Sequence, residues 1–150
     1  MHETQLSAAP KLTIQRTFAA PRARVFSAWT DVEMLRQWFS PDGRLTDVRW
    51  DPREGGMFRI TMIVPSGEEW AVRGVFSEVR APERLAFTFR WEEDDPAQER
   101  DTFITVELLD KEQETEMIFT HEGLRDAASR DNHRDGWTTW FDSLDRALAA

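Results

Sequence analysis

The sequence of 150 residues contains no cysteine and no tyrosine. Without thiols, a disulfide framework, a zinc–thiolate centre and a cysteine nucleophile are all excluded. Without a phenol, the ten Phe and seven Trp residues supply apolar surface but no weakly acidic hydroxyl for catalysis. The aromatic content therefore favours a function based on shape and hydrophobic contact.

Runs of positive charge and long apolar runs are also missing. The 19 Lys and Arg residues are scattered among 28 Asp and Glu, and the net charge is −9. Because nucleic-acid binding depends on clustered Lys and Arg, we expect no nucleic-acid partner. No apolar run can span a bilayer, and the opening MHETQLSAAP has neither the basic region nor the apolar segment of a secretory signal. The sequence therefore predicts a cytoplasmic protein without a membrane span.

Length and composition fit one globular domain. Hydrophobic residues make up 40% of the chain and charged residues 31%, and there are no repeats. Pro10 marks the end of a segment with no hydrophobic pattern. We therefore expect a flexible N-terminal segment over 1–10 and a single domain over 11–150.

Hydrophobic periodicity predicts a strand, two short helices, six further strands and a long final helix. Asp31, or Thr30 just before it, is placed as the N-cap of the second helix. Because the six later strands follow one another through short turns rich in Gly, Pro and Asp, they should form an antiparallel meander. The predicted elements are the strand 11–20, the helices 21–31 and 31–39, the strands 45–50, 56–64, 68–79, 83–92, 102–110 and 114–124, and the helix 132–150.

Alternation along these strands leaves one face of the sheet strongly apolar. Leu85, Phe87 and Phe89 share that face in one strand, and the final helix carries a matching stripe. The helix is therefore predicted to cover the concave side of the sheet. Gly136 is unfavourable in this helix by only about 1 kcal/mol, whereas each large buried side chain contributes roughly 1.5–3 kcal/mol. The stripe consists of His133, Trp137, Trp140, Phe141, Leu144 and Leu148.

Five segments between Lys11 and Ala149 carry a resemblance to a known family. They are FAAPRARVFSAWTDVEMLRQWFSPDG, GGMFRI, GVFSEVRAPERLAFTFRW, ETEMIFTHEGL and HRDGWTTWFDSLDRAL. In this order they make the chain similar to the START-like superfamily, also called SRPBCC or birch-pollen-allergen-like. Within it, the chain resembles small bacterial stand-alone members of the family named after the activator of the heat-shock-protein-90 ATPase. The resemblance implies an α+β helix-grip fold, in which a curved antiparallel sheet of about seven strands wraps around a long C-terminal helix and two short helices follow the first strand.

The resemblance also implies a binding function. Members of the superfamily enclose a cavity between sheet and helix and bind lipids, steroids, polyketides or other apolar molecules, and a minority are enzymes. The family's name comes from a eukaryotic co-chaperone with an extra N-terminal domain, whereas ten residues precede the first strand here. Our first hypothesis is a non-catalytic domain that binds a small apolar molecule, lipid-like, aromatic or polyketide-like. The alternatives are a cyclase-like or hydrolase-like enzyme acting on such a ligand, and a co-chaperone-like protein-interaction module.

The candidate cavity combines the inward-facing residues of the sheet with the stripe of the final helix. Large aromatic side chains would form its walls, and the competing interpretation is that the same side chains simply fill the core. The predicted cavity residues are Phe58, Ile60, Trp70, Phe76, Phe87, Phe89, Trp91, Val106, Met117, Phe119, His121, Trp137, Trp140, Phe141 and Leu144.

His121 is the most informative polar residue among these candidates. Its place in the strand 114–124 puts it on the inward face, where a neutral imidazole can bind a ligand or act as acid or base. The alternative is a core histidine whose nitrogens are satisfied within the protein, and the sequence favours this interpretation. No catalytic residue is therefore assigned, and His121 is the single candidate.

No motif indicates a metal or a cofactor, and none is predicted. Gly136 is expected to mark a close approach to a strand or, together with residues 123–132, an entrance to the cavity. Charges on the outer face of the sheet disfavour a dimer interface without excluding it, so a monomer and a homodimer both remain open. No spacing such as HExxH links the metal-ligating residue types near the last strand, which are His121, Glu122, Asp126 and His133.

Overall fold

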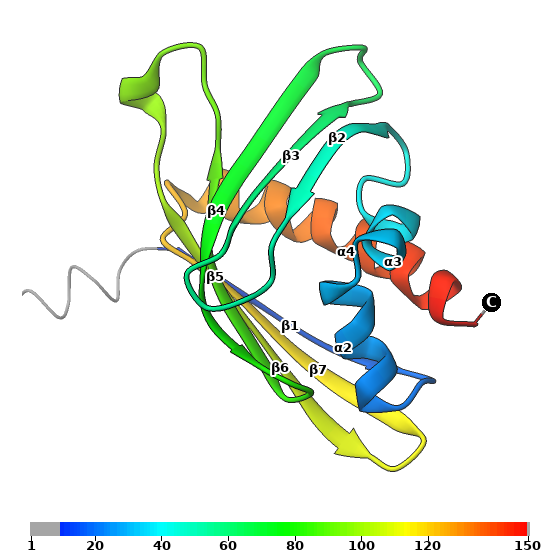
Figure 1. Ribbon diagram of the computed structural model, residues 1–150. Helices are drawn as coiled ribbons and strands as arrows, with labels where there is room; N and C mark the ends of the chain where they lie inside the picture. Colours follow the sequence, from blue (N-terminus) through cyan, green and yellow to red (C-terminus); the bar gives the residue numbers. More distant parts are fainter. Residues whose placement is uncertain (1–9, 150) are drawn as a thin grey trace, which may run out of the picture.

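The computed structural model describes residues 10–149, which form a curved sheet accompanied by helices (Figure 1). The elements follow the predicted order, and the predicted α+β helix-grip architecture is confirmed. Apart from Pro10, the N-terminal segment predicted over 1–10 lies outside the described residues. The elements are β1 (Lys11–Phe18), α2 (Arg22–Thr30), α3 (Val32–Trp38), β2 (Arg44–Trp50), β3 (Met57–Ile63), β4 (Glu69–Arg80), β5 (Arg84–Trp91), the short 3-10 helix η1 (Pro96–Gln98), β6 (Thr102–Lys111), β7 (Glu114–Glu122) and α4 (Ala127–Ala149).

The sheet is an antiparallel meander that β1 extends at one edge. Its strand order is β1-β7-β6-β5-β4-β3-β2. β1 pairs with β7, so that Leu12 lies opposite His121 and Ile14 opposite Phe119. Because successive strands reverse direction, the ends of β3, β5 and β7 and the starts of β2, β4 and β6 meet at one end of the sheet. α4 also begins at this end, directly after β7.

The predicted apolar face of the sheet is buried. Phe87 and Phe89 of β5, for example, are 3% and 2% exposed. α4 crosses the concave side of the sheet (Figure 1), and its residues Trp137, Phe141 and Leu144 are buried as the predicted stripe requires. The helix and the sheet therefore share one hydrophobic core.

The two short helices complete the core beside the C-terminal half of α4 (Figure 1). Of the two predicted caps, Asp31 is the one that caps α3, because its carboxylate accepts a hydrogen bond from the Glu33 N–H at 2.9 Å. The helices insert Trp29 and Trp38 between the sheet and α4. The centroids of the two indole rings lie 6.1 and 6.2 Å from the ring centroid of Phe141 on α4. The space between sheet and helix is thus filled by indole rings at this end.

α4 begins at Ala127, earlier than the predicted start at residue 132. The Asp126 carboxylate accepts a hydrogen bond from the Ser129 N–H at 2.8 Å, which is the geometry of a helix N-cap. The missed signal is Asp126 itself, a residue type that favours the N-cap, placed directly before the helix. Within residues 10–149, neither α4 nor another helix is both long and apolar enough to cross a membrane.

The outer face of the sheet carries arginines in direct register. Arg73 lies opposite Arg59 on one side and Arg90 on the other. Such like charges repel unless they are compensated. Carboxylates from the connection between β5 and β6 compensate them, with Glu92 2.7 Å from Arg59 and Glu99 2.7 Å from Arg73. These ion pairs hold the connection against the sheet, at the end where α4 begins.

Candidate functional site

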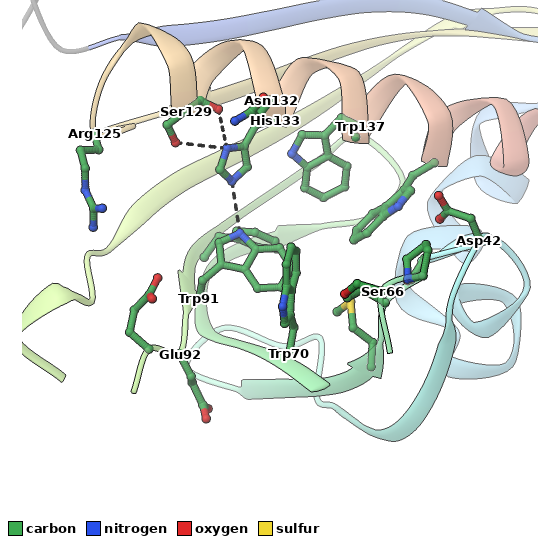
Figure 2. A pocket seen from close by; sticks show the side chains of 18 of the residues that line it. Asp42, Ser66, Trp70, Trp91, Glu92, Arg125, Ser129, Asn132, His133 and Trp137 are labelled. Atoms are coloured by element: carbon green, nitrogen blue, oxygen red, sulfur yellow. Dashed lines mark hydrogen bonds between the residues drawn. The ribbon is translucent and has the colours of Figure 1, made fainter. Parts of the chain in front are cut away.

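A cleft of about 910 Å³ lies between the N-terminal half of α4 and the sheet, at the ends of β3 and β5 and the start of β4 (Figure 2). The segment that follows α3 borders it, since Ser40 and Asp42 are part of its lining. The connections before β2, between β3 and β4, and after β5 and β7 all reach it, because the meander gathers them at this end. The cleft is lined by Ser40, Asp42, Met62, Val64, Pro65, Ser66, Trp70, Phe89, Trp91, Glu92, Glu93, Arg125, Asp126, Ala128, Ser129, Asn132, His133, Gly136, Trp137 and Trp140.

Tryptophan side chains form the main walls of the cleft. Trp70 and Trp91 come from neighbouring strands, and their rings are nearly perpendicular with centroids 5.6 Å apart. Trp137 and Trp140 come from α4 and form a second such pair, with centroids 5.1 Å apart. Trp70 is 46% exposed, although it occupies an inward position in β4. Two apolar walls, one from the sheet and one from the helix, therefore face a common space (Figure 2).

His133 lies in the helical wall and is hydrogen-bonded at both nitrogens. Its Nδ1–H donates to the Ser129 carbonyl at 2.7 Å, and its Nε2 accepts from the Trp91 indole N–H at 3.2 Å (Figure 2). Burial lowers the pKa of His133, and the bond to the Ser129 carbonyl opposes that shift. His133 is therefore neutral at physiological pH, with its proton on Nδ1.

His121 lies behind the cleft and is fully buried. Its Nδ1 accepts from the Trp137 indole N–H at 3.2 Å, and its Nε2 lies 2.8 Å from the Thr102 hydroxyl oxygen. That hydroxyl donates its own proton to the Phe89 carbonyl at 2.6 Å, so the proton between the two side chains belongs to His121 Nε2. Burial and the nearby His133 lower the pKa of His121 to about 3.

The two histidines connect the walls of the cleft. Their rings lie edge to face, with centroids 5.1 Å apart. Each accepts a hydrogen bond from a tryptophan that lines the cleft, His133 from Trp91 and His121 from Trp137. Because buried donors require acceptors, these bonds fix the orientation of both indole rings. The histidines thus hold the aromatic walls in place.

Charged groups surround the aromatic walls. Glu92 binds Arg59 through two hydrogen bonds of 2.7 and 2.9 Å, and the Arg59 guanidinium lowers the pKa of the Glu92 carboxyl. Arg125 donates to the Gln98 carbonyl at 2.8 Å. Over residues 10–149, no three or more His, Cys, Asp or Glu side chains are arranged to hold a metal ion. Glu92 and Arg125 are therefore already bound to groups of the protein itself.

The family of the chain follows from a sequence comparison. The sequence model of the family described as "Activator of Hsp90 ATPase homolog 1-like protein" matches residues 19–149, from the end of β1 to the end of α4. The chain belongs to this family. Among curated proteins, no sequence matches the chain. Membership in the Hsp90-activator-homologue family agrees with the resemblance found in the sequence.

Solved structures of bacterial proteins share the fold of this family member. The AHSA1 protein of Silicibacter pomeroyi superposes with a TM-score of 0.85 at 24% identity, over 93% of this chain and 98% of its own. A protein of Chromobacterium violaceum gives a TM-score of 0.84 at 24% identity, over 93% and 97%. A protein of Rhizobium leguminosarum gives 0.82 at 26% identity, over 93% and 94%. The similarity therefore concerns the whole helix-grip domain.

The structure divides the predicted cavity residues into two groups. Five of them line the cleft, namely Trp70, Phe89, Trp91, Trp137 and Trp140. The remaining ten do not line it, because the aromatic side chains of α2 and α3 pack against the central part of the sheet. A direct contact of this second group with a ligand stays a prediction. The group consists of Phe58, Ile60, Phe76, Phe87, Val106, Met117, Phe119, His121, Phe141 and Leu144, all of them buried.

The predicted list of cavity residues omitted most of the polar lining. The alternating direction of the strands was a usable signal. In an antiparallel meander, every second connection lies at the same end of the sheet, and these include the turns SPDG and PSG and the segment after β7. Periodicity identifies faces of elements, whereas this lining comes mainly from the connections between them. Of the residues absent from the predicted cavity list, His133 belongs to the predicted helix stripe, and Gly136 and the residues within 123–132 belong to the predicted entrance. The absent residues are Ser40, Asp42, Met62, Val64, Pro65, Ser66, Glu92, Glu93, Arg125, Asp126, Ala128, Ser129, Asn132, His133 and Gly136.

Gly136 does not mark a close approach to a strand, and that expectation was wrong. A side-chain carbon added at Gly136 would meet no other heavy atom within 4 Å, apart from its own neighbourhood in the helix. The residue instead lines the cleft, as do several residues of 123–132. The entrance predicted at this place therefore stays a prediction, now attached to a known cleft.

Proposed function

We propose that the protein is a non-catalytic binding domain for a small apolar molecule with one polar end, held in the cleft between α4 and the sheet. The observation that carries this proposal is the pair of tryptophan walls around a space of about 910 Å³. Clefts of this size and character are typical of small-molecule sites. A buried eight-carbon chain would gain roughly 6 kcal/mol of transfer free energy, which the loss of ligand freedom partly offsets.

The arrangement of His121 favours binding over catalysis. A general acid or base must reach the reacting group within hydrogen-bond distance. His121 is fully buried, does not line the cleft, and has both nitrogens engaged within the protein. His133 does line the cleft, but its nitrogens are bound to the Ser129 carbonyl and to Trp91. The histidines therefore support the walls and are not available as free proton carriers.

Two measurements test the binding function. Native mass spectrometry of the purified protein, followed by denaturing analysis, reveals any small molecule that it retains. In parallel, the neutral aromatic probe N-phenyl-1-naphthylamine is titrated by fluorescence into the wild type and into Gly136→Leu, whose side chain would extend into the cleft. We expect Gly136→Leu to bind the probe about tenfold more weakly, as loss of roughly two buried methylene contacts requires.

Matched variants separate occlusion of the cleft from a general change in α4. Gly136→Ala keeps the cleft open, and Thr138→Leu adds the same side chain at an exposed position of the helix outside the lining. Both should bind the probe like the wild type. Equal affinity of Gly136→Leu and the wild type, or no binding of the probe by any of the proteins, would contradict the proposed function.

A further inference from the structure

The cleft presents indole faces in several directions. Trp70 and Trp91 meet at an interplanar angle of 77°, and Trp137 and Trp140 meet at 75°. Two perpendicular pairs, one on the strands and one on α4, surround the same space (Figure 2). The face of an aromatic ring carries negative charge density, and tryptophan attracts cations more strongly than the other aromatic residues do. An aromatic enclosure of this kind suits a positively charged group.

The charged side chains around the cleft also favour a positively charged ligand. The described lining contains four carboxylates, those of Asp42, Glu92, Glu93 and Asp126, and one guanidinium, that of Arg125. His133 adds no positive charge, since burial lowers its pKa. Even with Glu92 neutralised by Arg59 outside the cleft, acidic groups remain in excess. A cation is therefore attracted to this space and an anion is repelled from it.

The features that could bind an anion are already engaged by the protein. The N-terminus of α4 is capped by its own Asp126 carboxylate, which accepts from the Ser129 N–H. Arg125 donates to the Gln98 carbonyl, and Figure 2 shows it at the end of the cleft opposite to Asp42. Within residues 10–149, the Asp42 carboxylate has no hydrogen bond or ion pair. A negative charge free to pair with a ligand thus lies at the end remote from Arg125.

We infer that the ligand of the cleft is an organic cation, in which an amine or quaternary ammonium group is joined to an apolar alkyl or aryl body. This inference rests on the proposed function and defines the polar end of its ligand. The cationic head contacts the indole rings at the end near Asp42, and the apolar body lies along Met62 and Val64, which also line the cleft. Charge complementarity then selects among ligands of similar shape.

The test compares three ligands with one apolar body and different head charges. Octyltrimethylammonium, octanamide and octanoate are titrated into the full chain by isothermal titration calorimetry, below their micellar concentrations. We expect the cation to bind about 5–30-fold more tightly than the neutral amide, the range of one partly desolvated cation–aromatic contact, and octanoate to bind most weakly. Equal affinity of the cation and the amide, or tighter binding of octanoate, overturns this inference but leaves the proposed function intact. Failure of all three ligands to bind overturns both.

Variants locate the preference in the cleft. Trp70→Leu removes an indole that is 46% exposed, and Phe103→Leu is its control, because Phe103 is 52% exposed on β6 and does not line the cleft. Asp42→Asn removes the unpaired charge, and Asp110→Asn removes a charge at the hairpin between β6 and β7. The ratio of cation to amide affinity should fall in Trp70→Leu and Asp42→Asn and stay unchanged in the two controls. An unchanged ratio in both cleft variants overturns the assignment of the cation to this place.

Discussion

His121 should make the folded protein sensitive to acid, and His121→Gln should remove that sensitivity. The histidine donates from Nε2 to Thr102 and accepts at Nδ1 from Trp137. A glutamine amide can also donate from its nitrogen and accept at its oxygen, but it does not titrate. The substitution therefore keeps the hydrogen-bonding types of the site and removes its proton equilibrium.

The size of the effect follows from the difference between two pKa values. Burial and His133 lower the pKa of folded His121 to about 3, from 6.5 for an unperturbed histidine. Between these two pH values the unfolded chain binds a proton that the folded protein does not. The contribution of His121 to the free energy of unfolding is therefore fully present above about pH 6.5 and is lost progressively as the pH falls. Each pH unit below the unfolded pKa corresponds to 1.36 kcal/mol. At about pH 5, His121 therefore lowers the free energy of unfolding by roughly 2 kcal/mol.

Chemical denaturation of both proteins at about pH 7.5 and at about pH 5 measures this loss. Other groups, such as His133 and Glu92, titrate in both proteins and cancel in the comparison. The free energy of unfolding of the wild type should fall by about 2 kcal/mol more than that of His121→Gln. Long-range ¹H–¹⁵N NMR spectra provide a second readout, since His121 should carry its proton on Nε2 and remain neutral at about pH 5. Equal losses in the two proteins, or a His121 that is protonated at that pH, would refute this assignment of the site.

Two further substitutions have definite expected effects. Gly136→Ala should raise the free energy of unfolding by about 1 kcal/mol, because alanine is the better helix former and its side chain meets no other atom there. Calorimetry should show the melting temperature rising by roughly 2–4 °C. A decrease would contradict the open geometry at this residue. Thr102→Val should destabilise the protein by roughly 1–3 kcal/mol, since it leaves the His121 Nε2–H without an acceptor. Thr102→Ser keeps the hydroxyl, so its free energy of unfolding, measured with denaturant, should fall clearly less. Equal losses in the two variants would show that the hydroxyl is not the acceptor.

The fold could be predicted from the sequence because its elements repeat with clear periods. Phe87 and Phe89 alternate with polar residues, and they lie on the inner face of the sheet as that alternation requires. Trp137, Phe141 and Leu144 recur at helical spacing and face the core. In both cases a local pattern is enough, since a strand or helix with one apolar face must cover it.

The site was predicted only in part, because it depends on which side chains occupy the concave space and which leave part of it open. Periodicity places Trp91 and Phe119 on the same inner face, yet Trp91 lines the cleft and Phe119 lies in the core. The difference arises from Trp29 and Trp38, which the short helices insert beside α4. Their positions depend on how α2 and α3 pack against distant elements, and sequence patterns do not contain that information.

The seven tryptophans offer the most direct test of a binding cleft between α4 and the sheet. Trp70, Trp91, Trp137 and Trp140 line the cleft, while Trp29, Trp38 and Trp50 do not. The indole N–H signals, assigned through single Trp→Phe variants, are followed by ¹H–¹⁵N NMR while octyltrimethylammonium or octanamide is added. If the cleft binds the ligand, the four cleft signals shift progressively and the other three stay nearly constant. Shifts confined to the signals of Trp29, Trp38 and Trp50, or no shift at all, would contradict a ligand site in this cleft.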